Sequence, residues 1–117
     1  WTPGTEGKKA INQLAMVLSQ NKEIAVLIEG HTDNEPYIGD SKLSGNWDLS
    51  VKRATAIVNI LLKNKGVLPE NITAAGKGEF SPLVPNNSAT NKSKNRRIEV
   101  ILAPKLDEIG RLLQDLD

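Results

Sequence analysis

The sequence predicts a single α+β domain in which helices pack on one face of a mixed sheet. Apolar residues recur at helical spacing in three segments, and short apolar runs typical of strands lie between them. The resulting order is helix, strand, helix, strand, strand, helix, which is typical of an α+β sandwich. A length of 117 residues fits one domain, and we assign residues 1–117 to it.

The first two elements follow from hydrophobic spacing. Residues 6–20 are expected to form an amphipathic helix, because four apolar residues recur at positions i, i+3, i+4 and i+7. These residues are Ile11, Leu14, Ala15 and Leu18. The apolar run at 24–28 is too short for a stable helix and is followed by Gly30, so it predicts a strand buried on both faces.

The remaining elements alternate with two long loops. Residues 31–46 have the composition of a loop, and helical spacing returns at Asp48 and closes near Gly66, after two lysines in the last turn. Two further strands are expected, with a loop that includes the polar run 85–97 between them, and a last helix closes the chain. The strands span 72–75 and 98–102, the second is stopped by Pro104, and the last helix spans about 105–116.

Composition excludes several classes of function. Fifteen basic residues against fourteen acidic ones, with four aromatics, offer neither the field nor the stacking surface for nucleic acid. Without Cys and with one His, the chain cannot form a disulfide, a thiolate nucleophile or the usual zinc sites. No cofactor-binding motif is complete, since the segment 76–79 lacks the third glycine of a dinucleotide loop. We therefore expect no cofactor and no nucleic-acid partner.

No run approaches the roughly 20 apolar residues of a membrane span, and no charged-then-apolar stretch indicates a signal peptide. Because the chain begins with Trp1, we expect a mature or excised fragment, so that any targeting or anchoring segment upstream is not visible.

Polar residues follow the first strand, where ligands bind in sheets flanked by helices. Asp33 is the main candidate there. Glu29, His31 and Asp33 alternate like a metal triad, but a single His argues against metal, and we expect none. His31 is expected to be a partly buried structural residue whose ring hydrogen-bonds the backbone.

A second candidate segment starts the helix after the loop. Asn46 or Asp48 is expected to cap this helix, and Arg53 lies about one turn in, where it can reach back over the loop. From spacing alone Arg53 is a solvated helix-face charge, and Trp47 is a packing lid on the loop. The basic cluster at 92–97 is interpreted as a solvated loop, and no Gly-x-Ser-x-Gly elbow supports a hydrolase triad.

Four motifs in order resemble the C-terminal peptidoglycan-binding domain of the OmpA, Pal and MotB family. They are GHTDN at 30–34, NWDLSVKRA at 46–54, GKGE at 76–79 with Pro82, and NRRIEV at 95–100. The Asn-Trp-Asp-Leu-Ser form is closest to the MotB-like branch. The resemblance implies a βαβαββ sandwich with a family-like core of about 5–103, whose first strand we expect to be missing from this chain.

The resemblance also implies a function and a site. It implies non-catalytic binding of the diaminopimelate in the stem peptide of peptidoglycan, with Asp33 on its ammonium group and Arg53 on its carboxylate. Such a charge pair suits an amino-acid end that carries both charges on one carbon. The other implied binding residues shape the pocket or buttress Asp33. They are Thr32, Asn34, Asn46, Leu49, Asn95 and Arg96.

Two alternatives remain open: a protein-interaction module that forms a homodimer through the last helix, and a cell-wall hydrolase. The family implies a periplasmic, envelope-associated domain, with an outer-membrane parent protein.

Overall fold

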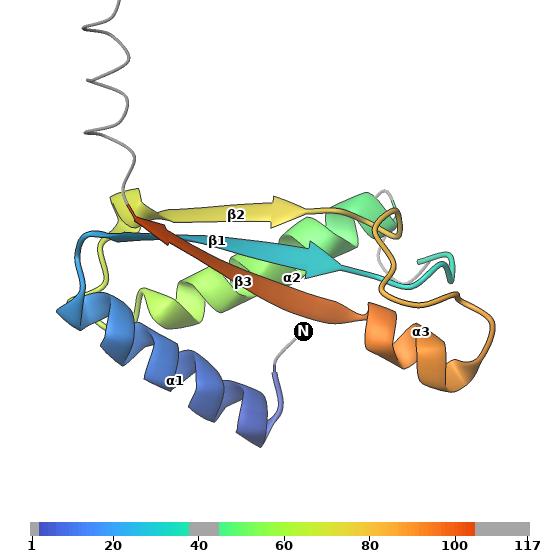
Figure 1. The fold of residues 1–117 in the computed structure, drawn as a ribbon, viewed down its shortest axis with the longest axis horizontal. Helices are drawn as coiled ribbons and strands as arrows, with labels where there is room; N and C mark the ends of the chain where they lie inside the picture. Colours follow the sequence, from blue (N-terminus) through green and yellow to red (C-terminus); the bar gives the residue numbers. More distant parts are fainter. Residues whose placement is uncertain (1–2, 38–44, 105–117) are drawn as a thin grey trace, which may run out of the picture.

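The computed structural model describes residues 3–37 and 45–104, and this part of the chain is a mixed α+β fold (Figure 1). The helices are α1 (Thr5–Gln20), α2 (Asn46–Leu61) and α3 (Ala89–Asn95), with a 3-10 turn η1 (Pro69–Asn71); the strands are β1 (Ile24–His31), β2 (Ile72–Gly76) and β3 (Arg97–Pro104). The predicted fold class is confirmed.

The strands form one sheet in the order β2-β1-β3. β1 pairs in parallel with β2, which it reaches through α2, and antiparallel with β3, where His31 lies opposite Arg97. α2 packs on β1 and β2, and α1 packs on α2. Both helices lie on the same side of the sheet, as Figure 1 shows, so the expectation of helices on one face is confirmed.

The core lies between this helical layer and the sheet. Along β1, Val26 and Ile28 are buried whereas Ala25 and Leu27 are partly exposed. The prediction of a strand buried on both faces was therefore wrong; burial alternates, because helices cover only one face. The buried core residues are Ile11, Ala15, Leu18, Val26, Ile28, Ala54, Ile57, Leu61 and Val67.

Two paired glycines allow α2 to approach the sheet closely. Gly30 of β1 and Gly76 of β2 are register partners. A Cβ atom at Gly30 would lie 2.0 Å from the Ser50 carbonyl oxygen, and one at Gly76 would lie 2.3 Å from Ser50 Oγ. Only glycine fits at such a contact. The first turns of α2 are therefore held against the end of β1, next to Asp33.

Several predicted boundaries need correction. α2 ends at Leu61, before the end that the two lysines and Gly66 predict. β1 and β3 each extend beyond their apolar runs. α3 lies within the predicted loop 85–97. Ser88 caps this helix by accepting a hydrogen bond from the Asn91 N–H at 3.1 Å. α3 has no apolar stripe, since its one buried residue is Asn95, so hydrophobic periodicity could not reveal it.

The predicted last helix lies outside the described residues. Within the described ranges, no helix is both long enough and apolar enough to cross a membrane.

The outer strand β3 carries an apolar surface. Val100, Ile101 and Leu102 are each a little under half exposed. Beneath them lies an apolar groove of about 500 Å³ between α1, α2 and β3. None of the candidate site residues lines this groove.

Candidate functional site

Asp33 lies just after β1 and is almost completely buried, with 5% of its surface exposed. Its Oδ2 accepts a hydrogen bond from Arg96 Nη1 at 2.5 Å, and its Oδ1 accepts one from the Glu35 N–H at 3.0 Å. A carboxylate has about four lone-pair positions, so Asp33 keeps the capacity to accept further hydrogen bonds. The charge partner Arg96 comes from the turn between α3 and β3, so the pair joins two distant parts of the chain.

Arg53 lies near this pair, half-buried on α2. Burial and the like charge of Arg96 lower the pKa of the Arg53 guanidinium, and the charge of Asp33 opposes the shift. Arg53 is therefore not the solvated surface charge that spacing alone predicts. The Asp33 carboxylate thus lies near two guanidinium groups, those of Arg53 and Arg96. An added anion would stabilise the charged form of Arg53.

Thr32 and Asn46 hold the loop that carries Asp33. Thr32 Oγ1 donates to the Asp33 carbonyl at 2.8 Å. The Asn46 side-chain amide donates to the carbonyls of Asp33 and Glu35 at 3.2 and 3.0 Å. The expectation that Asn46 or Asp48 caps α2 was wrong: Gly45 occupies the N-cap without a side-chain hydrogen bond, at a φ of 91° that favours glycine.

The other pocket candidates differ in exposure. Asn34 is exposed, and Leu49 is partly buried on the first turn of α2. Asn95 is fully buried and faces a different loop. Its Oδ1 accepts from the N–H groups of Leu83 and Val84 at 2.9 and 3.2 Å, and its Nδ2 donates to the Val84 carbonyl. The structure thus brings Arg96, rather than Asn95, to Asp33.

His31 is buried, but its partners differ from the prediction. Its Nε2 lies 2.8 Å from Glu29 Oε1 and 3.0 Å from Glu99 Oε2, so it contacts carboxylates rather than the backbone. Glu99, instead of Asp33, completes the group of three potential metal ligands that could bind one ion. The Arg97 guanidinium also donates to Glu99 at 2.7 Å. The Glu29 carboxylate is thus already in contact with His31, and the Glu99 carboxylate with His31 and Arg97.

A polar hollow of about 380 Å³ opens beside Arg96, between the loop after β1 and α3. An ion pair between Lys92 and Glu35 lies along it. Sequence reasoning missed Glu35 and interpreted Lys92 as part of a solvated loop, because no local pattern relates residues so far apart in the chain.

Trp47 and Phe80 stack on each other at the same end of the molecule. Their ring centroids are 5.2 Å apart, and the rings are inclined by 29°. Trp47 lies over Gly78, in the loop that follows β2, whereas the sequence predicts a lid on the loop before α2. Sequence reasoning did not single out Phe80.

The chain matches the OmpA family model over residues 4–96. It is 38% identical over 93 residues to Motility protein B of Bacillus subtilis, a match that covers 80% of this chain and 35% of that protein. It is 37% identical over 93 residues to the Peptidoglycan-associated lipoprotein of Buchnera aphidicola, covering 80% of this chain and 50% of the relative. The chain thus spans about a third to a half of the length of these relatives.

Solved structures agree with this assignment. A putative MotB-like protein from Desulfovibrio vulgaris superimposes with a TM-score of 0.78 at 27% identity, covering 90% of this chain and 69% of that one. The C-terminal domain of Helicobacter pylori MotB superimposes with a TM-score of 0.79 over 99% of this chain and 87% of that one; at 22% identity this likeness shows the fold alone. The chain therefore belongs to the OmpA family, and its similarity to MotB and Pal proteins agrees with the motifs between residues 30 and 100.

Proposed function

We propose that this domain binds peptidoglycan non-covalently and without catalysis, through the diaminopimelate of the stem peptide. The single observation that carries the proposal is the buried Asp33 carboxylate, bound by Arg96 next to Arg53. Family membership and the relative named Peptidoglycan-associated lipoprotein support peptidoglycan as the ligand.

The charges suggest a role for each side chain. The free end of diaminopimelate carries an ammonium and a carboxylate on one carbon. The ammonium group binds Asp33, whose carboxylate has acceptor positions left, and the carboxylate binds the Arg53 guanidinium. Arg96 holds Asp33 in place, while Thr32 and Asn46 fix the loop. Asn34 and Leu49 border the ligand, and Asn95 acts indirectly by bracing the neighbouring loop.

The whole protein would be anchored to the cell wall through this domain. The relatives named as lipoprotein, porin and motility protein support a periplasmic, envelope-associated position. We propose that the parent protein belongs to the outer membrane or to another part of the envelope.

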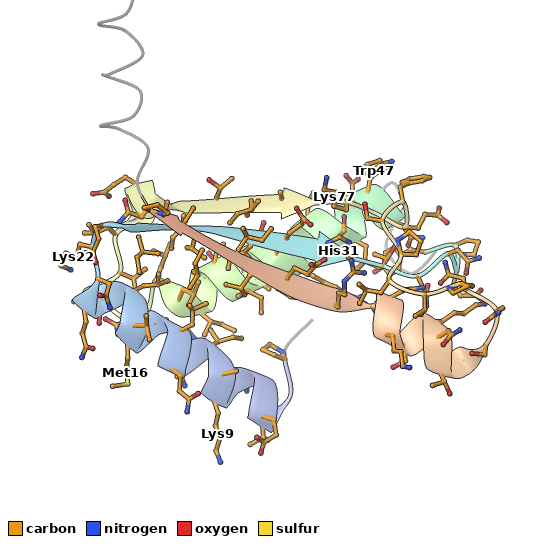
Figure 2. All side chains as sticks on the ribbon, in the orientation of Figure 1. Lys9, Met16, Lys22, His31, Trp47 and Lys77 are labelled. Carbon is orange, nitrogen blue, oxygen red and sulfur yellow. The ribbon has the colours of Figure 1, made fainter. Side chains whose placement is uncertain are left out.

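The test is retention on purified sacculi. Asp33→Ala and Arg53→Ala each remove one member of a desolvated charge set, which costs roughly 2 to 5 kcal/mol, or about thirtyfold to several-thousandfold in affinity. Both variants should lose sedimentation with sacculi. Glu23→Ala and Lys9→Ala are matched controls, because they remove the same kinds of charge from exposed positions elsewhere; Figure 2 shows Lys9 on α1, away from Trp47 and His31. Unchanged retention of either site variant would contradict the charge-pair model.

Calorimetric titration tests the ligand class. A stem peptide that contains diaminopimelate should bind, whereas the same peptide with lysine in its place should bind much more weakly, because a lysine within a peptide ends in an ammonium group without the carboxylate that Arg53 requires. Equal binding of the two would remove the proposed role of Arg53. Release of soluble fragments from sacculi by the domain would instead favour a hydrolase.

A further inference from the structure

The site end of the molecule carries an exposed aromatic pair. Trp47 is 52% exposed and Phe80 is 64% exposed, although the whole chain has only four aromatic residues. Neither ring belongs to the hydrophobic core. Large apolar rings that stay exposed while stacked on each other offer a surface for a partner.

The pair has a rigid support. Gly78, at a φ of 59°, lies beneath both rings, and a Cβ atom there would lie 3.3 Å from Trp47. The Gly78 N–H donates to Ser50 Oγ at 3.0 Å, and Ser50 Oγ donates to the Trp47 carbonyl at 2.8 Å. Because Ser50 is fully buried, these bonds fix the backbone of Trp47 relative to the Gly78 loop. The ring surface is therefore preorganised, which lowers the entropic cost of binding.

The pair is also joined directly to the proposed diaminopimelate site. The Thr32 N–H donates to the Gly78 carbonyl at 2.9 Å, so the loop under the rings is tied to the residue before Asp33. On the other side, Asn46 precedes Trp47 and donates to the Asp33 carbonyl. In Figure 2, Trp47 lies at the same end of the molecule as His31, two residues before Asp33, and far from Met16.

We infer that Trp47 and Phe80 form a stacking platform for a pyranose ring of the glycan strand. This inference rests on the proposed function, since a stem peptide bound at Asp33 is covalently attached to a sugar. A few peptide residues span only about 3.3 to 3.6 Å each, so the sugar stays close to the peptide site. The flat face of a pyranose presents C–H bonds with partial positive charge, which complement the negative face of an aromatic ring.

The experiment compares three soluble probes: a diaminopimelate-containing stem peptide, the same peptide attached to its disaccharide, and chitotetraose. Trp47→Ala and Phe80→Ala should bind the disaccharide peptide about threefold to tenfold more weakly. Their affinity for the sugar-free peptide should be unchanged, and Trp47→Phe should retain most of the binding. Met16→Ala is the matched control, since Met16 is also an exposed apolar side chain, at 57%.

Fluorescence gives a direct readout of the platform. The chain has two tryptophans, so in a Trp1→Phe background only Trp47 emits. The disaccharide peptide should change this emission more than the sugar-free peptide does. An equal loss of affinity for both peptides in the alanine variants would indicate a purely structural role and overturn the inference. Unchanged affinity of the alanine variants for both peptides would also overturn it. A wild-type dimer that Trp47→Ala dissociates would do the same.

Chitotetraose separates this inference from the proposed function. If the wild type binds neither peptide, the diaminopimelate proposal fails; binding of chitotetraose that is lost in Trp47→Ala would still support the platform. If chitotetraose and the disaccharide give no response that depends on Trp47, the platform is disproved even where the sugar-free peptide binds.

Discussion

Asp33, Arg53 and Arg96 show how one side chain can depend on others distant in the sequence. The Asp33 carboxylate is buried and bound by Arg96 at 2.5 Å, while burial and the charge of Arg96 lower the pKa of Arg53. The ionisation of Arg53 thus depends on both of the other charges. Removing a single residue will change the electrostatics of the whole group, so effects of double substitutions at this site should not be additive.

At the same scale, the segment 95–97 shows how three neighbouring side chains bind different parts of the protein. Its three side chains lie in one sequence motif but serve three separate partners: Asn95 braces the loop at 83–86, Arg96 binds Asp33, and Arg97 binds Glu99. The motif therefore connects three regions at the start of β3.

A prediction follows for Asn95. Asn95→Ala removes four hydrogen bonds from a fully buried position and leaves the N–H groups of Leu83 and Val84 without their acceptor. Each of these part-buried hydrogen bonds contributes a net stabilisation of about 0.5 to 1.5 kcal/mol, so denaturant unfolding should show a loss of about 1 to 3 kcal/mol. Asn91→Ala, a more exposed asparagine of the same helix, should cost less. Equal stability of the two variants would contradict the bracing role.

At the scale of elements, the contact between α2 and the sheet positions the site. Gly30 and Gly76 lie side by side in β1 and β2, and Ser50 of α2 packs on both. This close approach brings the segment from Asn46 to Arg53 to the end of β1. The glycine of the GHTDN motif is thus explained by helix packing rather than by a turn.

Gly30→Ala tests this account. The added Cβ atom would meet the Ser50 carbonyl, a backbone atom that cannot move without shifting α2. Overpacking of this kind costs typically 1 to 3 kcal/mol, and displacement of α2 should also weaken binding to sacculi. Gly4→Ala is the control, because a Cβ atom there meets nothing within 4 Å; its cost should not exceed about 1 kcal/mol. A fully stable Gly30→Ala variant would mean that the helix is not held by this contact.

At the scale of the whole molecule, one core supports both layers. Ile28 is completely buried in the central strand and belongs to the cluster that joins β1 to α1 and α2. Because α1, β2, β3 and η1 each contact β1 or α2, the described fold should unfold as one cooperative unit.

Ile28→Ala should therefore lower the stability of the whole domain. Such a cavity costs about 2 to 5 kcal/mol, and for a domain of this size each kcal/mol lowers the Tm by about 3 to 6 °C. Circular dichroism and fluorescence should report the same transition. Val17→Ala, at a position 44% exposed on α1, should change stability by less than about 0.5 kcal/mol. Separate transitions by the two probes would contradict a single core.

Local patterns were sufficient for much of this architecture. Hydrophobic spacing predicted α1 and α2, because each helix buries one face and burial leaves a periodic trace in the chain, whereas short apolar runs predicted the three strands. Motif order predicted the family. Spacing could not find α3, whose residues are mostly exposed and whose one buried side chain is polar.

The tertiary structure decided which polar residues meet. The pairing of Asp33 with Arg96, of Lys92 with Glu35, of His31 with Glu99 and of Trp47 with Phe80 joins residues that lie in different elements or loops. Hydrogen bonds and ion pairs depend on the distance between two atoms, to within a few tenths of an ångström, and on the direction of the donor. They leave no periodic signal in the sequence. Composition and spacing therefore determined the layers of this protein, whereas folding alone determined the geometry of the charges and rings at its binding end.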